Sequence, residues 1–288
     1  MKTKAIILLA LASTLLAGCG RTKMGIQVKG SDTMVNLGQA WAEEFMKQNP
    51  NLSIAVTGGG SGVGIASLIN GSADIAQASR QMKEEEYAAA RKNKMNPREF
   101  QVGIDALTVV VHPKNPISRL TIKQLGDIYT GKIKNWKEVG GDDKPILLLS
   151  RDKNSGTHVF FLEHVLRGGN PKGPEEFAKS ALLLVSSQAI ADQVAENPTA
   201  IGYFGLGYYN PKKQKALAIA KDDKSPYVLP SVKTALTGEY PISRPLYMYT
   251  PRQPVGDVKA FIEFALSPKG QQIVNKMGFV PLAKSPAG

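Results

Sequence analysis

From Ile26 onward, apolar runs of strand length alternate with amphipathic stretches of helix length. The long stretches repeat apolar residues every three to four positions, whereas the short runs are continuous or alternate with period two. This periodicity predicts strands at 26–29, 52–57 and 73–78 and helices at 33–47 and 63–69. Strands that alternate with helices favour an α/β lobe built on a mostly parallel sheet.

Two later apolar segments, 107–111 and 240–249, indicate strands that leave this lobe and return to it. The same patterns predict, in chain order, a helix at 121–129, a strand at 146–149, a helix at 154–166, a buried segment at 200–206 and helices at 255–266 and 268–277. Two crossings that join two lobes around a cleft are typical of periplasmic binding proteins. We therefore expect one lobe over residues 26–107 and 242–288, and a second lobe over residues 108–241.

The N-terminus has the pattern of a lipoprotein signal peptide. An apolar run over residues 5–16 follows two lysines, and Leu16-Ala17-Gly18-Cys19 matches a lipobox. The run is too short to cross a bilayer as a permanent helix. We expect residues 1–18 to be removed, Cys19 to carry the lipid (palmitate among its acyl chains) and residues 19–25 to form a tether. An ordinary secretory signal with an incidental cysteine is the alternative. Cys19 is the only cysteine in the chain, so no internal disulfide can form.

The formal net charge of +12 favours an anionic ligand or a membrane surface as partner. The basic residues are scattered singly and no aromatic residues are interleaved with them, so we expect no nucleic-acid partner.

Three loops place small residues and hydroxyls where helices are expected to begin. They are Gly30-Ser31-Asp32-Thr33, Gly58-Gly59-Gly60-Ser61-Gly62 and Arg151-Asp152-Lys153-Asn154-Ser155-Gly156-Thr157. A helix start offers unpaired N–H groups and the positive end of the helix dipole. An arginine adds a bidentate grip on two oxygens. Together the loops predict a pocket for an oxyanion, although plain helix caps with a surface arginine would give similar sequences.

Other chemistry has weaker support. The 58–62 loop lacks the lysine of a phosphate-binding P-loop, so no nucleotide is expected. The histidines lack metal-ligand spacing, and we expect neither a metal nor a cofactor. Ser155 and His158 form a conceivable nucleophile pair without an orienting acid. We expect no enzyme, and a secreted hydrolase that uses Ser61 or Ser155 stays open as an alternative.

The chain resembles the phosphate-binding lipoproteins and periplasmic proteins of phosphate ABC transporters over nearly its whole mature length. The resemblance rests on Gly30-Ser31-Asp32-Thr33, Gly58-Gly59-Gly60-Ser61-Gly62, Ala73-Asp74-Ile75-Ala76 with Ala78-Ser79-Arg80, Thr130-Gly131-Lys132-Ile133-Lys134-Asn135-Trp136, Ser155-Gly156-Thr157 and Ala200-Ile201-Gly202-Tyr203. It implies a two-lobe type II binding fold with two hinge crossovers and a ligand cleft. It also implies a protein that captures inorganic phosphate and hands it to a membrane permease.

The resemblance also implies the ligand contacts. The expected phosphate-binding residues are Ser31, Thr33, Met34 through its N–H, Ser61, Arg80, Arg151, Ser155, Gly156 and Thr157. Arg80 departs from the better-known members, which have an aspartate there. No carboxylate is adjacent to Arg80 in sequence, and its side chain is expected either to reach into the cleft or to form a salt bridge across it. Another group must then accept the phosphate proton, and Asp32, another carboxylate or a main-chain carbonyl are the choices left open.

We therefore expect an exported, lipid-anchored, monomeric phosphate receptor at the cell envelope, on the outer face of the plasma membrane or the periplasmic side of an envelope membrane. A receptor for sulfate, molybdate or tungstate is the nearest alternative, and a surface adhesin built on the same fold is a more distant one.

Overall fold

The computed structural model describes residues 25–282. The predicted signal peptide, Cys19 and all of the predicted tether except Gly25 therefore lie outside the described residues. Within 25–282, none of the helices is long and apolar enough to cross a membrane.

The described strands fall close to the predicted positions, with several short additions. They are β1 (Ile26–Gly30), β2 (Ile54–Thr57), β3 (Ile75–Ala78), β4 (Arg98–Val111), β5 (Arg119–Thr121), β6 (Leu147–Arg151), β7 (Leu182–Leu184), β8 (Ala200–Gly205), β9 (Lys215–Ala216), β10 (Ala218–Ala220) and β11 (Ser243–Thr250).

The α-helices are α1 (Val35–Gln48), α2 (Ser61–Ile69), α3 (Glu84–Lys92), α4 (Ile122–Tyr129), α5 (Gly156–Phe161), α6 (Ser187–Glu196), α7 (Val232–Leu236), α8 (Gly256–Leu266) and α9 (Pro268–Lys276). The described residues also include three 3₁₀ turns and one π-turn, namely η1 (Asp32–Met34), η2 (Trp136–Val139), η3 (Leu162–Leu166, π) and η4 (Leu206–Tyr208). The helix predicted at 154–166 is thus α5 continued by the π-turn η3.

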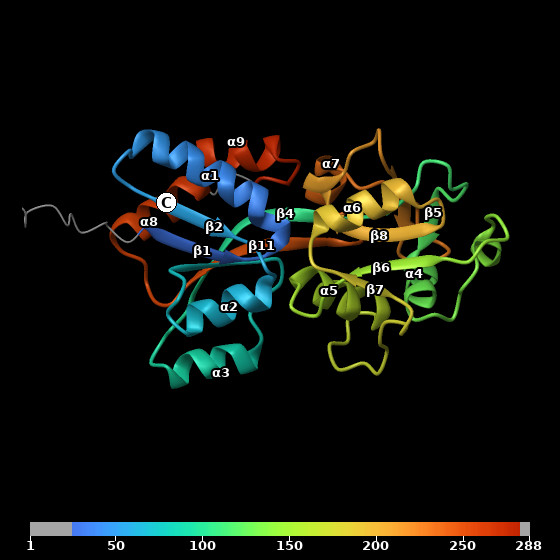
Figure 1. Ribbon diagram of the computed structural model, residues 1–288, viewed down its shortest axis with the longest axis horizontal. Helices are drawn as coiled ribbons and strands as arrows, with labels where there is room; N and C mark the ends of the chain where they lie inside the picture. The colour runs from blue at the N-terminus through green and yellow to red at the C-terminus, as the bar shows by residue number, and fades with distance from the viewer. Residues whose placement is uncertain (1–24, 283–288) are drawn as a thin grey trace, which may run out of the picture.

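The main sheet runs through two lobes in the order β2-β1-β3-β11-β4-β8-β6-β7. In Figure 1 the first lobe holds β1, β2 and β3 with α1, α2, α3, α8 and α9, and the second holds β6 to β8 with α4 to α7. Strands within each lobe pair in parallel, β1 with β2 and β3, and β6 with β7 and β8. The sheet is mixed rather than mostly parallel because β11 pairs antiparallel with both β3 and β4, and β4 pairs antiparallel with β8.

The long strand β4 belongs to both lobes. Residues 98–106 pair with β11, and from Leu107 onward β4 pairs with β8 instead. β4 and β11 run side by side between the two lobes (Figure 1). The predicted two-lobe α/β fold with two crossings is confirmed, whereas the lobe boundaries at 107/108 and 241/242 stay predictions.

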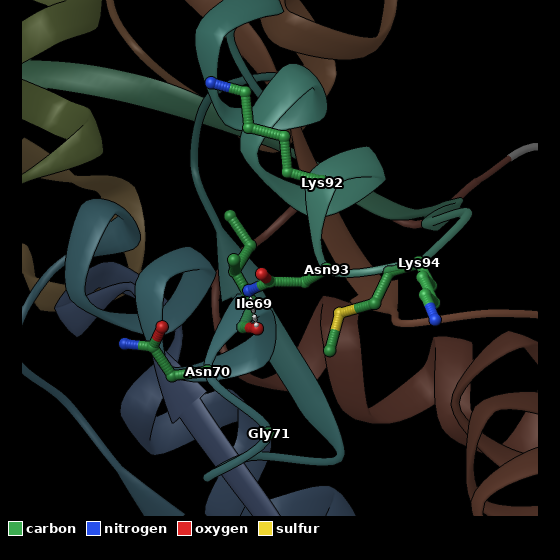
Figure 2. Close-up of a pocket in the computed structure, with 7 residues that line it drawn as sticks. Ile69, Asn70, Gly71, Lys92, Asn93 and Lys94 are labelled. Carbon is green, nitrogen blue, oxygen red and sulfur yellow. Dashed lines mark hydrogen bonds between the residues drawn. The ribbon is translucent and has the colours of Figure 1, made fainter.

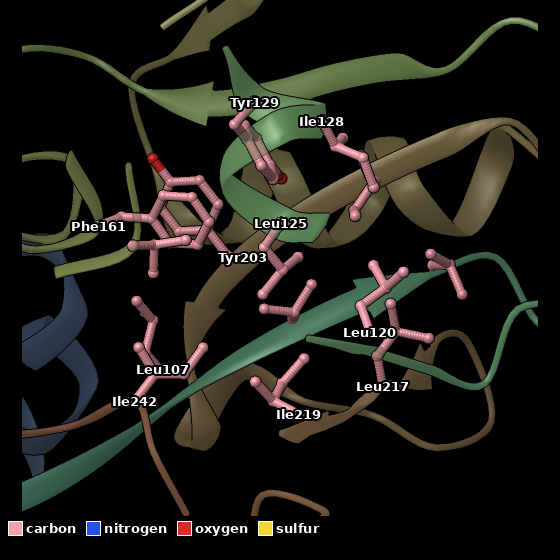
Figure 3. Close-up of a cluster of buried hydrophobic side chains, with 14 of the residues drawn as sticks. Leu107, Leu120, Leu125, Ile128, Tyr129, Phe161, Tyr203, Leu217, Ile219 and Ile242 are labelled. Carbon is pink, nitrogen blue, oxygen red and sulfur yellow. The ribbon is translucent and has the colours of Figure 1, made fainter. Parts of the chain in front are cut away.

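Each lobe has its own apolar core. In the first lobe, Trp41 of α1 and Phe261 of α8 pack on one face of the sheet with Val28, and α2 covers the other face. In the second lobe, aromatic rings stack in the centre of the core, with Phe161 and Tyr203 3.9 Å apart at an angle of 7° (Figure 3). Two separate cores allow each lobe to move as a unit, so the loops between them can form a cleft.

Candidate functional site

Five buried hydroxyl side chains meet where the two lobes face each other. They are Ser31, Thr33, Ser61 and Ser79 from the first lobe and Thr157 from the second, each at most 2% exposed. We call these five residues the hydroxyl cluster. Four of them follow the carboxyl ends of β1, β3 and β6, and Ser61 begins α2. Ligands gather at this edge in α/β sheets, because the strand-to-helix loops converge there.

The serines of the hydroxyl cluster bond to one another. Ser31 Oγ donates to Ser79 Oγ at 3.0 Å, and the Ser79 N–H donates to Ser61 Oγ at 3.0 Å. Ser61 Oγ and Ser79 Oγ lie 3.4 Å apart. A chain of hydroxyls can both donate to and accept from a bound group, because each has one donor and two lone pairs.

The lobes approach closely at the hydroxyl cluster. Thr33 Oγ1 and Thr157 Oγ1 come from opposite lobes and lie 2.9 Å apart. The Gly62 N–H donates to the Asn154 carbonyl across the same junction at 3.0 Å. A Cβ on Gly156 would lie 2.3 Å from Ser61 Oγ. Glycine at position 156 therefore allows the two helix starts to meet.

Arg244, which was not among the predicted site residues, extends from β11 to the hydroxyl cluster. Its Nη2 donates to Thr157 Oγ1 at 2.9 Å and to Thr33 Oγ1 at 3.3 Å, and its Nη1 donates to the Ser79 carbonyl at 3.2 Å. Nε and Nη2 also donate to Asp105 Oδ2 at 3.1 and 2.9 Å. Burial lowers the pKa of Arg244, the carboxylate of Asp105 opposes that shift, and the guanidinium keeps its charge.

A sequence signal for this pair existed. Asp105 and Arg244 each stand in one of the two apolar crossing segments, within or beside the predicted ranges. A charged residue in a buried strand needs a partner of opposite charge. Two single opposite charges in two buried crossing strands therefore indicate that each needs a partner of opposite charge, and the strand register identifies that partner.

Arg151 is buried beside the hydroxyl cluster and contacts the first lobe through Asp32. Its Nη1 donates to Asp32 Oδ2 at 3.0 Å. Ser155 and Gly156 follow at the start of α5, where Ser155 Oγ accepts the N–H groups of Thr157 and His158 at 3.2 and 3.4 Å. Ser155 thus caps α5, and its hydroxyl belongs to the helix start rather than to the hydroxyl cluster.

Arg80 pairs within its own lobe, not across the cleft. Its Nη1 and Nη2 donate to the two carboxylate oxygens of Glu86 at 2.8 and 2.7 Å. The sequence expectation overlooked Glu86, which stands six residues later in the first turn of α3 and is brought back to Arg80 by that turn. Arg80 Nε is buried and has no hydrogen-bond partner among residues 25–282. The side chain also lines a cavity of about 400 Å³ between the lobes, together with Phe160 and Arg244.

Two further groups considered in the sequence analysis, the Met34 N–H and the His158 ring, also contact other protein groups. The Met34 N–H donates to the Ser31 carbonyl at 3.0 Å. The ring of His158 stacks on Phe177, and its Nδ1 lies 3.2 Å from Ser150 Oγ. Ser155 and His158 therefore do not form a nucleophile pair. No group of three or more histidine, cysteine or acidic side chains within residues 25–282 is arranged to hold a metal ion.

A second, open pocket lies at the C-terminal ends of α2 and α3 (Figure 2). Lys92, Asn93 and Lys94 line it, and Asn93 Nδ2 donates to the Ile69 carbonyl at 2.9 Å. None of the predicted ligand residues lines this pocket, so it is separate from the hydroxyl cluster.

The chain matches known binding proteins in sequence. A family model described as a PBP superfamily domain matches residues 17–269. The phosphate-binding protein PstS of Pseudomonas aeruginosa is 34% identical over 270 residues, which cover 88% of this chain and 81% of that protein. PstS of Bacillus subtilis is 33% identical over 258 residues, which cover 89% of this chain and 80% of that protein.

Solved structures are similar as well. A phosphate ABC transporter substrate-binding protein from Clostridium perfringens, with bound phosphate, has a TM-score of 0.80 and 32% identity, covering 90% of this chain and all of that one. An ABC-type phosphate transport receptor from Vibrio cholerae has a TM-score of 0.71 and 30% identity, covering 89% of this chain and all of that one. These likenesses confirm the predicted binding-protein fold. The chain belongs to the PBP superfamily and, within it, to the PstS family of phosphate-binding proteins.

Proposed function

We propose that this protein is the substrate-binding component of a phosphate ABC importer and holds inorganic phosphate at the hydroxyl cluster. The observation that carries the proposal is the juxtaposition of Thr33 and Thr157 from opposite lobes, with the Arg244 guanidinium on both hydroxyls. Buried hydroxyls and a cation suit an oxyanion that must lose its water shell. The PstS relatives are named phosphate-binding proteins, and the Clostridium perfringens structure holds phosphate.

The predicted contacts are kept as part of this proposal. Ser31, Thr33, Met34, Ser61, Ser155, Gly156 and Thr157 lie at or beside the hydroxyl cluster, where hydroxyls and N–H groups can surround a tetrahedral anion. Arg80 and Arg151 lie near it with protein partners of their own.

The proton of phosphate needs an acceptor, and both nearby carboxylates already bind arginines. Asp32 accepts from Arg151, and Asp105 accepts from Arg244. We infer that a hydroxyl oxygen of the hydroxyl cluster accepts the phosphate O–H. A hydroxyl oxygen repels sulfate less than a carboxylate does, so we expect weaker discrimination against sulfate than a carboxylate site would give. A receptor for another oxyanion therefore stays the second candidate.

The cellular setting is also proposed. The lipobox supports an exported protein, lipid-anchored through Cys19 at the cell envelope, and a diacylglyceryl group with a further acyl chain would give a stable anchor. The partners that fit are inorganic phosphate and the membrane subunits of an ABC permease, with a single copy of this chain as the receptor. The family consists of transport binding proteins rather than enzymes, which agrees with the expected absence of catalysis.

Calorimetric titration of the purified protein, stripped of bound ligand, with phosphate, sulfate and molybdate at two pH values tests the proposal. We expect phosphate to bind most tightly, and Thr157→Val to weaken binding about tenfold or more because one buried hydroxyl is lost. Thr108→Val is the matched control, since the buried Thr108 hydroxyl donates to Ala106 on its own strand. Stronger binding of sulfate or molybdate would overturn the phosphate assignment.

A further inference from the structure

Basic side chains without acidic partners gather at the end of the first lobe where β1 begins. Lys92 and Lys94 line the open pocket at the end of α3 (Figure 2), Arg98 begins β4, and Arg252 follows β11. All four are exposed, and none forms an ion pair within the described part of the chain. We call these four residues the basic face. We propose that the basic face lies on the anionic phospholipid headgroups of the membrane that holds the lipid anchor.

Strand register places the basic face at the end of the lobe to which the predicted tether is attached. β3 pairs with β1 through Ile75 and Val28, and Thr250 at the end of β11 pairs with Arg98 at the start of β4. The starts of β1, β3 and β4 and the end of β11 therefore share one edge of the sheet. This edge is about 15 Å wide, because neighbouring strands lie about 4.8 Å apart. In Figure 1 it faces away from the second lobe.

The proposed anchor keeps this edge close to the membrane. Residues 20–25 separate Cys19 from β1, and a chain of that length spans about 20 Å when fully extended. A cation close to an anionic membrane strengthens binding by about fivefold. The basic face would thus fix the orientation of a receptor that the lipid alone leaves free to turn. This inference rests on the lipid anchor in the proposed cellular setting, and it does not involve the phosphate site.

The charge of the basic face is directed to solvent. Asp74 and Glu99 lie at the same edge, but Asp74 Oδ2 accepts the Gln27 N–H at 2.8 Å, and Glu99 Oε2 accepts the Tyr249 hydroxyl at 2.6 Å. None of the residues that line the pocket is acidic. An anionic surface can therefore approach the lysines of the basic face without first displacing a carboxylate.

Lys94 has a backbone conformation that favours glycine. In the described part of the chain it is the one non-glycine residue with a positive φ, 57°. It follows α3 in a Schellman motif, in which its N–H donates to the Arg91 carbonyl at 2.9 Å. The Met95 N–H donates to the Ala90 carbonyl at 3.0 Å in the same motif. Glycine fits this position without steric cost, whereas lysine lowers the stability of the fold. Contact with headgroups explains what the lysine side chain contributes in return.

Co-sedimentation with vesicles tests the proposal on the chain from Gly20 onward, made without lipid. We expect this chain to bind vesicles of phosphatidylcholine mixed with phosphatidylglycerol, and not vesicles of phosphatidylcholine alone. Lys92→Gln with Lys94→Gln should weaken binding by about tenfold or more, because two cations are lost. The matched control is Lys212→Gln with Lys213→Gln, which removes the same charge from an exposed turn of the second lobe. The control should bind vesicles as the wild type does.

Lys94→Gly separates the charge of the side chain from its effect on folding. We expect the midpoint of thermal unfolding to rise by about 1–2 °C, because the strained conformation is relieved, while vesicle binding weakens by about fivefold. Lys94→Arg keeps the charge and should bind vesicles as the wild type does. A higher midpoint with unchanged vesicle binding in Lys94→Gly would overturn the proposal.

Three other outcomes would also overturn it. They are unchanged binding of the Lys92/Lys94 variant, an equal loss in the control, and displacement of the vesicles by saturating inorganic phosphate, which would indicate a site for the free anion instead. A wild-type protein that binds no phosphate in calorimetry would overturn the phosphate assignment alone. A Cys19 that takes up no labelled palmitate in cells would overturn the anchor, whereas failure to bind anionic vesicles would overturn the basic face and leave the anchor in place.

Discussion

The two arginine–aspartate pairs of the molecule have the same chemistry but different structural support. Arg244 and Asp105 lie on adjacent strands in register, and their side chains are 1% and 0% exposed. Arg151 and Asp32 come from different lobes, and the Asp32 side chain is 16% exposed. The first pair is fixed by a β-ladder, whereas the second depends on how the lobes face each other.

This difference indicates how one anion site can have a stable framework and still allow the two lobes to move. A fully buried ion pair cannot gain water when one partner is lost, so its integrity is part of the fold. A pair at a lobe junction can regain water when the lobes separate. We therefore expect the Arg244 pair to govern folding and the Arg151 pair to govern closure.

The largest expected effect is that of Arg244→Ala. The substitution leaves Asp105 as a buried, unpaired carboxylate, so the free energy of unfolding should fall by about 3–5 kcal/mol. Urea unfolding followed by circular dichroism measures it. A loss below about 1 kcal/mol would mean that water reaches Asp105, and the contrast between the two pairs would then disappear.

Asp32→Ala should have a smaller effect on folding. The lobes can separate and hydrate Arg151, so we expect a loss of about 1.5–3 kcal/mol in the free energy of unfolding, the range for hydrogen bonds to charged groups. The same urea unfolding experiment measures this loss of free energy. A loss equal to that of Arg244→Ala would show that the lobe junction is as rigid as the β-ladder.

Gly156→Ala tests the comparison in another way, because it hinders closure of the two lobes and changes neither ion pair. The new methyl group would lie 2.3 Å from Ser61 Oγ and 2.8 Å from Ser79 Oγ, both in the other lobe. We expect phosphate affinity to fall by about tenfold or more, about 1.4 kcal/mol, with little change in the unfolding midpoint.

Gly126→Ala is the control for that variant, because its added Cβ would lie 3.2 Å from the Val165 carbonyl oxygen and 3.9 Å from Leu166 Cα, both in its own lobe. Equal affinities of the two glycine variants would contradict contact between the lobes at Gly156.

The smallest expected effect is a pH dependence of stability from His158. Burial lowers the pKa of this histidine below its ordinary value, and a hydrogen bond to the Arg151 backbone only partly opposes the shift. The unfolded chain therefore binds the proton more readily than the folded one just below pH 6.5, so folded stability declines as the pH falls through that region.

Thermal unfolding of His158→Gln between pH 7.5 and pH 5 checks this, with the exposed His164→Gln as control. We expect His158→Gln to flatten the pH dependence relative to the wild type. A steeper dependence in His158→Gln would reverse the sign assigned to the shift.

Much of the fold could be predicted because its signals are local. The period of the apolar residues placed β1, α1 and β6 within about two residues of their bounds. The hydroxyl-rich loops were also local signals, since a serine or threonine at a helix start caps the helix wherever that helix lies. The expected contact of the Met34 N–H with the ligand stays a prediction, and in the structure that N–H donates to the Ser31 carbonyl in the 3₁₀ turn that precedes α1.

The partners of the charged residues could be predicted far less well. Arg80 was expected to reach into the cleft or to form a salt bridge across it, whereas its partner Glu86 stands only six residues away in the same lobe, because the loop between them had no predicted path. Arg244 was overlooked because nothing near it in sequence indicates a ligand.

By itself, the sequence determined the α/β elements, the two crossings, the hydroxyl-rich helix starts and the family. The tertiary structure alone decided that Arg244 meets Asp105, 139 residues away, and that Arg151 meets Asp32, 119 residues away. The physical reason is how far along the chain the interacting residues lie from each other. Helices, strands and caps follow from hydrogen bonds and side-chain periodicity between near neighbours, whereas the partner of a buried charge depends on which strands and lobes lie side by side after folding.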